Sequence, residues 1–143
     1  MKTLEQERAS YAFDIVRKVK GRPYEKEFAS LVSKLPTLIL SNGFGNTLAF
    51  LYSKSKIHHL IAIGVIANWL LNKSDLKIVY GRFQEDFFDD THKVKESIED
   101  VLNSLVINAN IDQYTFVAEE ALRLLNWLKR FSEAILEKGD ENG

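Results

Sequence analysis

Hydrophobic residues along most of the chain recur at intervals of three and four, which is the spacing of amphipathic α-helices. The longest such stripe begins at Tyr114 and ends at Ile135. Its members follow alternating spacings of three and four residues: Tyr114, Val117, Ala121, Leu124, Leu128, Phe131 and Ile135. This heptad pattern predicts one long helix from about residue 111 to Lys138, ended by Gly139.

The first helix is marked at both of its ends. Thr3 and Gln6 have the spacing of a capping box, in which each side chain satisfies a backbone N–H group that the first helical turn leaves free. The helix should therefore begin at Leu4, and Gly21 should end it.

Four further helical patterns follow. A helix is predicted over residues 24–34, and Pro36 should break it because proline lacks the backbone donor that a helix interior uses. A short helix should then cover residues 35–40. Residues 45–54 and 57–72 predict two more helices, and the second is apolar on almost every side, as a central helix would be.

Residues 73–90 show no clear period, and we expect a long variable loop there. Asp89, Asp90 and Thr91 are candidate N-caps for the next helix, whose apolar stripe extends to Leu105.

At the C-terminus, residues 139–143 should fray. No internal repeat or low-complexity segment is visible. The sequence therefore predicts an all-α fold in which residues 1–143 form a single-domain bundle of six or seven helices with a long C-terminal helix.

The composition restricts the possible functions and compartments. The chain has no cysteine, which excludes disulfides, thiolate metal sites and cysteine nucleophiles and fits a reducing cytoplasm. Its charged N-terminus has no apolar signal core, and the longest apolar stretch, residues 60–71, is shorter than the roughly 20 residues of a spanning helix. We therefore expect a cytoplasmic protein without membrane contact.

The net charge of −1 gives no overall attraction for nucleic acid, which disfavours a free-standing nucleic-acid-binding domain. The charge is unevenly distributed, however. Residues 1–60 hold ten Lys or Arg against five Asp or Glu, whereas residues 61–143 hold nine against fifteen. The chain is therefore electrically two-sided, with a basic N-terminal part and an acidic C-terminal part.

Local signatures of catalysis are absent from the sequence. The three histidines are scattered, no Glu-x-x-His pair is present, and we expect neither a catalytic residue nor a cofactor nor a metal. His58 and His59 are adjacent and would point about 100° apart on a helix, so a structural or surface role is favoured. Asp89, Asp90 and His92 could contact a hard cation in a metal-dependent nuclease, but helix capping explains these acidic residues more simply.

Two helical surfaces are more informative. Arg123, Trp127 and Arg130 share one side of the long helix, which suits phosphates with a stacked base or sugar. Alternatively, Trp127 tucks against a neighbouring helix while the arginines pair with glutamates. Arg8 projects into the apolar stripe of the first helix, where it requires either a buried carboxylate or a place at the rim of a partner interface.

Two segments resemble a known family: residues 35–51 (LPTLILSNGFGNTLAFL) and residues 121–131 (ALRLLNWLKRF). Both are similar to the small helical subunit of the type III-B (Cmr-type) CRISPR effector complex, and residues 4–9 resemble the first helix of that family. Phe44 and Ser41 depart from the more familiar Leu and Asn of this pattern, and nothing is transferred to residues 73–100.

The resemblance implies an all-α, non-catalytic structural subunit that acts in antiviral defence. Copies would stack head to tail beside the backbone subunits that hold the CRISPR RNA, and would line the groove in which target RNA pairs with the guide. Cleavage would belong to other subunits. The resemblance covers about the N-terminal 55 residues and the C-terminal 30. The basic positions there that we expect first to contact RNA or a neighbouring subunit are Arg8, Lys54, Lys129 and Arg130.

Charge and geometry add Arg17, Lys18, Arg123 and Trp127 to this set. Arg17 and Lys18 belong to a cluster of cations near the end of the first helix. A different hypothesis is a protein–protein adaptor or homodimer without RNA contact, formed through the heptad stripe and the apolar stripe that contains Arg8.

Overall fold

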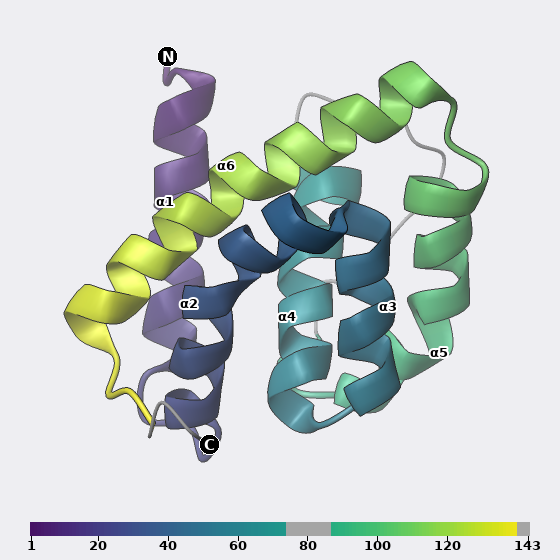
Figure 1. The fold of residues 1–143 in the computed structure, drawn as a ribbon. Coiled ribbons are helices and arrows are strands. Elements are labelled where there is room, and N and C mark those ends of the chain that lie inside the picture. The colour runs from purple at the N-terminus through teal and green to yellow at the C-terminus, as the bar shows by residue number, and fades with distance from the viewer. Residues whose placement is uncertain (74–86, 140–143) are drawn as a thin grey trace.

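A computed structural model of the chain describes residues 1–73 and 87–139. These residues form helices and no strand, which confirms the prediction of an all-α bundle with a long C-terminal helix (Figure 1). The six α-helices are α1 (Leu4–Val19), α2 (Glu25–Asn42), α3 (Phe44–Lys54), α4 (Ile57–Asn68), α5 (Thr91–Leu102) and α6 (Ile111–Ile135). Two π-helical turns, η1 (Trp69–Lys73) and η2 (Asn103–Ile107), extend α4 and α5.

Helix α4 is the centre of the hydrophobic core. Every residue from His59 to Leu71 is buried, as its uniformly apolar sequence predicts. Helices α3 and α5 pack against α4, while α6 runs obliquely across α1 and α2 (Figure 1). The first and last helices of the chain therefore lie in contact.

Capping boxes fix the starts of two helices. The Thr3 hydroxyl accepts a hydrogen bond from the Gln6 N–H at 3.1 Å, and the Gln6 side chain accepts one from the Thr3 N–H at 2.8 Å, which confirms Leu4 as the first residue of α1. Asn110 and Gln113 form the same reciprocal pair at the start of α6.

Helix α2 does not end at Pro36, so the predicted break and the separate helix over residues 35–40 are wrong. Pro36 removes one backbone hydrogen bond, but the buried stripe of Val32, Leu35 and Ile39 continues through it and packs against the rest of the core. This burial keeps α2 helical as far as Asn42, with a visible bend (Figure 1).

A single glycine joins α2 to α3. Gly43 has φ 88° and ψ 161°, a combination that is essentially restricted to glycine. Its N–H donates to the Ile39 carbonyl at 2.8 Å, and its carbonyl accepts from both the N–H and the hydroxyl of Thr47. Gly43 thus supplies a hydrogen-bond partner to the last turn of α2 and to the first turn of α3.

Helix α6 ends at Ile135, three residues before the predicted end at Lys138. Leu136 adopts an extended conformation and is buried, and the N–H of Glu137 donates to the Glu25 carboxylate at 2.8 Å. The N–H of Gly139 donates to the Lys26 carbonyl at 3.4 Å. The expected fraying is therefore wrong for Gly139, which is held against α2.

The remainder of the predicted tail, residues 140–143, lies outside the described residues, as does most of the predicted loop over 73–90. At the end of that loop, Phe87 is buried, and a Cβ on Gly64 would approach its ring to 2.6 Å. The turn that precedes α5 is thus anchored on the central helix.

The heptad stripe of α6 is used inside the chain. Val117, Ala121, Leu124 and Leu128 are all at most 1% exposed and pack against the core. The stripe of α1 is likewise buried against α6. The hypothesis of a homodimer or adaptor formed through these two stripes is therefore wrong, because both stripes are buried within the chain and are not available to a partner.

Candidate RNA-binding face

The charged residue in the stripe of α1 has a partner within the fold. Arg8 and Glu120 form a bidentate ion pair, in which the Nη2 of Arg8 lies 2.8 Å from Oε1 of Glu120 and Nε donates to Oε2. The indole N–H of Trp69 also donates to this carboxylate, at 3.2 Å. The hydrogen bond to Glu120 raises the pKa of Arg8. Arg8 thus forms the buried ion pair of the first alternative. Its guanidinium is occupied by Glu120, which contradicts the predicted contact of Arg8 with RNA or a neighbouring subunit.

Trp127 lies in the seam between α6 and α1. Its indole is half-buried and stacks on Phe131 with a centroid distance of 5.7 Å, and Phe131 meets Phe13 of α1 edge to face at 5.5 Å. The guanidinium of Arg17 lies 5.7 Å from the centre of the Phe13 ring. Part of the Trp127 ring is therefore tucked against neighbouring side chains, as the second interpretation of this surface predicts. The rest of the ring remains accessible to solvent.

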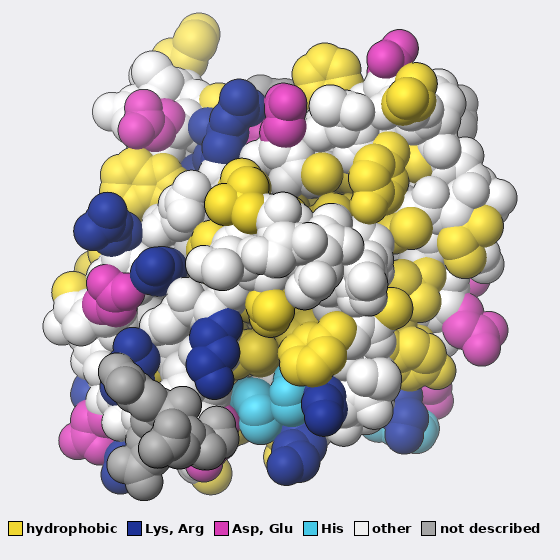
Figure 2. Space-filling view, in the orientation of Figure 1, with side chains coloured by type: hydrophobic (Ala, Val, Ile, Leu, Met, Phe, Trp, Pro, Cys, Tyr) yellow, Lys and Arg dark blue, Asp and Glu magenta, His cyan; other side chains and the backbone are white. Residues whose placement is uncertain are grey.

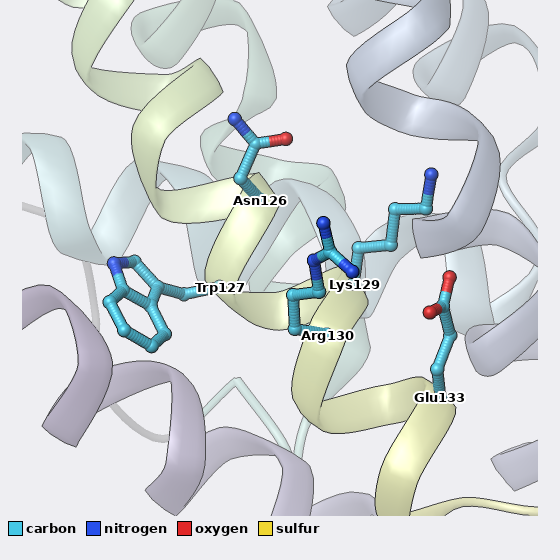
Figure 3. A pocket seen from close by; sticks show the side chains of 5 residues that line it. All are labelled: Asn126, Trp127, Lys129, Arg130 and Glu133. Atoms are coloured by element: carbon cyan, nitrogen blue, oxygen red, sulfur yellow. The ribbon is translucent and has the colours of Figure 1, made fainter.

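The two arginines near Trp127 on α6 are not paired with any described glutamate, although the second interpretation of this surface required such pairs. Arg123 and Arg130 are exposed, and neither forms an ion pair with any described residue. Of the glutamates that could pair with them, Glu120 is bound to Arg8. Trp127, Lys129 and Arg130 line an open hollow of about 610 Å³ together with Asn126 and Glu133. Figure 3 shows Trp127 and Lys129 on opposite sides of α6 with Arg130 between them.

This hollow continues towards α2. Lys129 and Glu133 also line a second hollow of about 310 Å³, which includes Lys34 and Lys138. Lys34 in turn lines a third hollow of about 620 Å³ between α2, α3 and the start of α4. The three adjoining hollows are lined by cations that we call the cationic face: Lys26, Lys34, Lys54, Lys56, Lys129, Arg130 and Lys138.

Figure 2 shows Lys and Arg side chains down the left of the view and along its lower edge, beside the histidines, whereas the hydrophobic side chains gather mainly at the centre and upper right. Glu27 and Glu133 are the carboxylates among the lining residues. Glu137 also approaches Lys26 to 3.9 Å. Among the described residues of this surface, cations thus outnumber carboxylates although the whole chain is slightly acidic.

The fold brings some of the predicted contact residues together. Lys54, Lys129 and Arg130 lie on the cationic face, and Trp127 borders it. Arg123 is exposed on α6, one turn before Trp127. Lys18 is separate, with its ammonium group 5.7 Å from the Phe88 ring in the turn before α5.

The sequence interpretation missed four members of the face: Lys26, Lys34, Lys56 and Lys138. The first two had a usable signal, because Lys26, Ser30 and Lys34 follow at intervals of four and must share one side of α2. Lys138 had none, since its position depends on how the chain leaves α6.

The chain is similar to known proteins over nearly its whole length. A family model described as CRISPR-associated protein (Cas_Cmr5) matches residues 4–135. The chain belongs to the Cmr5 family. The "CRISPR system Cmr subunit Cmr5" of Thermus thermophilus is 28% identical over 138 residues, which cover 96% of this chain and 100% of the relative.

The X-ray crystal structure of a CRISPR-associated Cmr5 family protein from Thermus thermophilus matches with a TM-score of 0.69 at 25% identity. This match covers 96% of the chain and 100% of the crystallised protein. Membership of the Cmr5 family confirms the resemblance seen in residues 35–51 and 121–131. It also extends that resemblance over nearly the whole chain.

The metal-dependent alternative finds no support in the geometry. Among the described residues, no group of three or more His, Asp or Glu side chains could hold a metal ion. Instead, Nε2 of His92 lies 3.1 Å from Oε1 of Glu96, and Oδ1 of Asp89 lies 4.0 Å from Nη1 of Arg22. Asp90 occupies the N-cap position of α5 but makes no side-chain capping hydrogen bond. Within the same described ranges, no helix has the length and hydropathy to cross a membrane.

Proposed function

We propose that the chain is a non-catalytic structural subunit of a Cmr-type (type III-B) CRISPR effector complex in antiviral defence, and that its cationic face contacts the guide or target RNA. Membership of the Cmr5 family and the Cmr subunit name of the Thermus relative support the assembly. The observation that carries the RNA contact is the continuous run of cations on α2, α3, α6 and the adjoining segments.

The physical basis is local neutralisation of phosphates. RNA backbones bind Lys and Arg chiefly through electrostatics and the release of counterions, and both depend on the cations near the strand rather than on the net charge of the chain. A subunit that meets RNA inside an assembly needs cations on the correct side only. The uneven charge of this chain is consistent with that arrangement.

Contacts with neighbouring subunits would use other surfaces. At the junction of α5 and α6, Ile107, Ile111 and Phe116 are 68%, 82% and 51% exposed. Helix α5 also presents acidic side chains, among them Glu99 and Asp100. An apolar and acidic end opposite a basic face suits head-to-tail stacking of copies, in which each contact joins two different surfaces.

The test is RNA binding by the complete effector complex at a series of salt concentrations. Replacing Lys34, Lys129 and Arg130 by Gln should weaken binding and reduce the slope of log affinity against log salt by about 0.7 for each lost contact with single-stranded RNA. Lys2→Gln, at the exposed N-terminus, is the control and should leave the slope unchanged.

Co-elution of the subunits in size-exclusion chromatography shows whether the substituted complexes still assemble. Unchanged affinity and an unchanged salt slope in an intact complex would contradict the RNA contact. That result would favour a protein adaptor that uses the exposed apolar end.

A further inference from the structure

The hollow between α2, α3 and the start of α4 has a composition that simple phosphate neutralisation does not explain. We call it the α4 hollow. Its volume of about 620 Å³ lies within the range of small-molecule sites, roughly 300–1,000 Å³. The side chains that line it are Lys26, Glu27, Ser30, Leu31, Lys34, Leu38, Phe50, Lys54, Lys56, His58 and His59, together with Gly139.

One part of this hollow is suited to an anion. Helix α4 begins there, and its N-cap residue, Lys56, makes no side-chain capping hydrogen bond. The N–H groups of Ile57, His58 and His59 have no acceptor among the described residues. The positive end of a helix dipole and free N–H groups bind phosphate. Lys54 and Lys56 lie beside this helix start and add positive charge.

His59 provides a second, independent indication of a ligand. It is 8% exposed, and its Nδ1 has no hydrogen-bond partner. Burial and the nearby cations lower its pKa to about 4, and burial also lowers the pKa of His58. Both rings are therefore neutral near pH 7. A buried polar atom without a partner is unfavourable, and a turn of the imidazole towards the hollow would let a polar group of a ligand reach it.

Another part of the hollow is aromatic. Phe50 is 39% exposed and meets His59 edge to face with a centroid distance of 6.3 Å. The rings of His58 and His59 lie 4.1 Å apart. The Lys54 ammonium group lies 5.7 Å from the centre of the Phe50 ring, so charge and ring surface are adjacent. Cations beside an accessible ring form the usual combination for a nucleotide in a single strand.

We propose that the α4 hollow binds one nucleotide of a single-stranded RNA, with its phosphate at the start of α4 and its base on Phe50. An inorganic anion would not use the ring and the apolar side chains of Leu31 and Leu38. This inference rests on the proposed function and makes it more specific, because it adds base contact to backbone contact at one site.

The experiment measures fluorescence anisotropy of the full-length chain with a labelled single-stranded oligoribonucleotide and with an abasic oligomer of the same length and backbone. The base-bearing RNA should bind more tightly. Phe50→Leu keeps an apolar side chain but removes the ring, so it should weaken binding of the base-bearing RNA about tenfold and leave the abasic oligomer unaffected. Phe13→Leu is the matched control, since Phe13 is a ring of nearly the same exposure, 38% against 39%, and lies on α1 outside the hollow.

A double variant, Lys54→Gln with Lys56→Gln, should weaken binding of both oligomers, because both carry phosphates. Crosslinking of 4-thiouridine RNA to the unsubstituted chain, mapped by mass spectrometry, gives a second measurement that no folding defect can affect. Crosslinks should fall between Phe50 and His59.

Equal affinity for the two oligomers, with the lysine dependence preserved, would overturn the nucleotide site and leave the proposed backbone contact intact. Binding that responds to Lys129→Gln but not to the two substitutions at Lys54 and Lys56 would also overturn it. If the chain and its effector complex bind neither oligomer at low salt, the proposed function itself fails.

Discussion

The buried Arg8–Glu120 pair allows a sharp test of what holds α1 to α6. The change is Glu120→Gln, which keeps the shape of the side chain and removes its charge. Glu120 is 1% exposed and Arg8 is 8% exposed, so water cannot replace the missing carboxylate. The guanidinium would remain buried opposite a neutral amide that cannot satisfy both of its donors and the Trp69 N–H.

The expected cost follows from this geometry. Removing one member of a buried ion pair costs about 3–5 kcal/mol. The amide oxygen keeps one acceptor in place, so we expect about 3 kcal/mol, against a total stability of about 5–15 kcal/mol for a domain. For a chain of this size the melting temperature should fall by about 10 °C.

Urea unfolding followed by circular dichroism measures the loss, and Glu119→Gln is the control. Glu119 is the preceding residue of the same helix and is exposed, so its substitution should change stability by no more than about 0.5 kcal/mol. A second variant, Arg8→Met with Glu120→Leu, removes both charges and should recover most of the loss, leaving about 1 kcal/mol for the unpaired Trp69 N–H. If Glu120→Gln and Glu119→Gln unfold alike, the pair does not hold α1 to α6.

Three other predictions concern the backbone, the C-terminal segment and pH. Gly43→Ala should destabilise the fold by about 1–3 kcal/mol because φ 88° is unfavourable for alanine, and unchanged urea unfolding would contradict this. Leu136→Ala should lower stability in the same assay by about 2 kcal/mol, whereas Ile111→Ala, at a position that is 82% exposed, should have little effect. The pKa of His59 is lowered from 6.5 to about 4, so the unfolded chain takes up its proton first and stability should fall as pH decreases from 6.5 towards 4. His59→Gln should reduce this dependence and His92→Gln, an exposed residue, should not; equal pH profiles for all three proteins would refute the assignment.

Local features of the fold could be predicted where neighbouring residues decide them. Thr3 and Gln6 placed the start of α1 correctly because a capping box needs only residues within one turn. The central position of α4 followed from its uniformly apolar sequence. The resemblance to the Cmr-type subunit was likewise recognised from short continuous segments, residues 35–51 and 121–131.

The failures arose where distant packing overrides local preference. Pro36 should end a helix, but the buried residues on both sides of it favour continuation. Leu136 continues the helical period in sequence, yet it leaves α6 to pack against α2. In both cases the decisive contact comes from a segment far away in the chain, which periodicity does not reveal.

Only part of the candidate site could be predicted, because its residues come from segments that are far apart in the sequence. Lys129 and Arg130 are adjacent on one helix and were recognised from their spacing, whereas Lys34 and Lys138 reach the same surface from other segments. Arg8 was recognised as requiring a partner, but the choice between Glu120 and another molecule depended on tertiary structure.

The contact between the first and last helices also determines when the chain can fold during its synthesis. Arg8 and Glu120 are 112 residues apart in the sequence. At about 5–20 residues per second, a ribosome adds Glu120 on the order of 10 s after Arg8. Until then the apolar side of α1 lacks the cover of α6, and the guanidinium lacks the Glu120 carboxylate. We therefore expect products that terminate before Glu120 to be protease-sensitive and prone to aggregation, so that a cell obtains either the whole subunit or none of it.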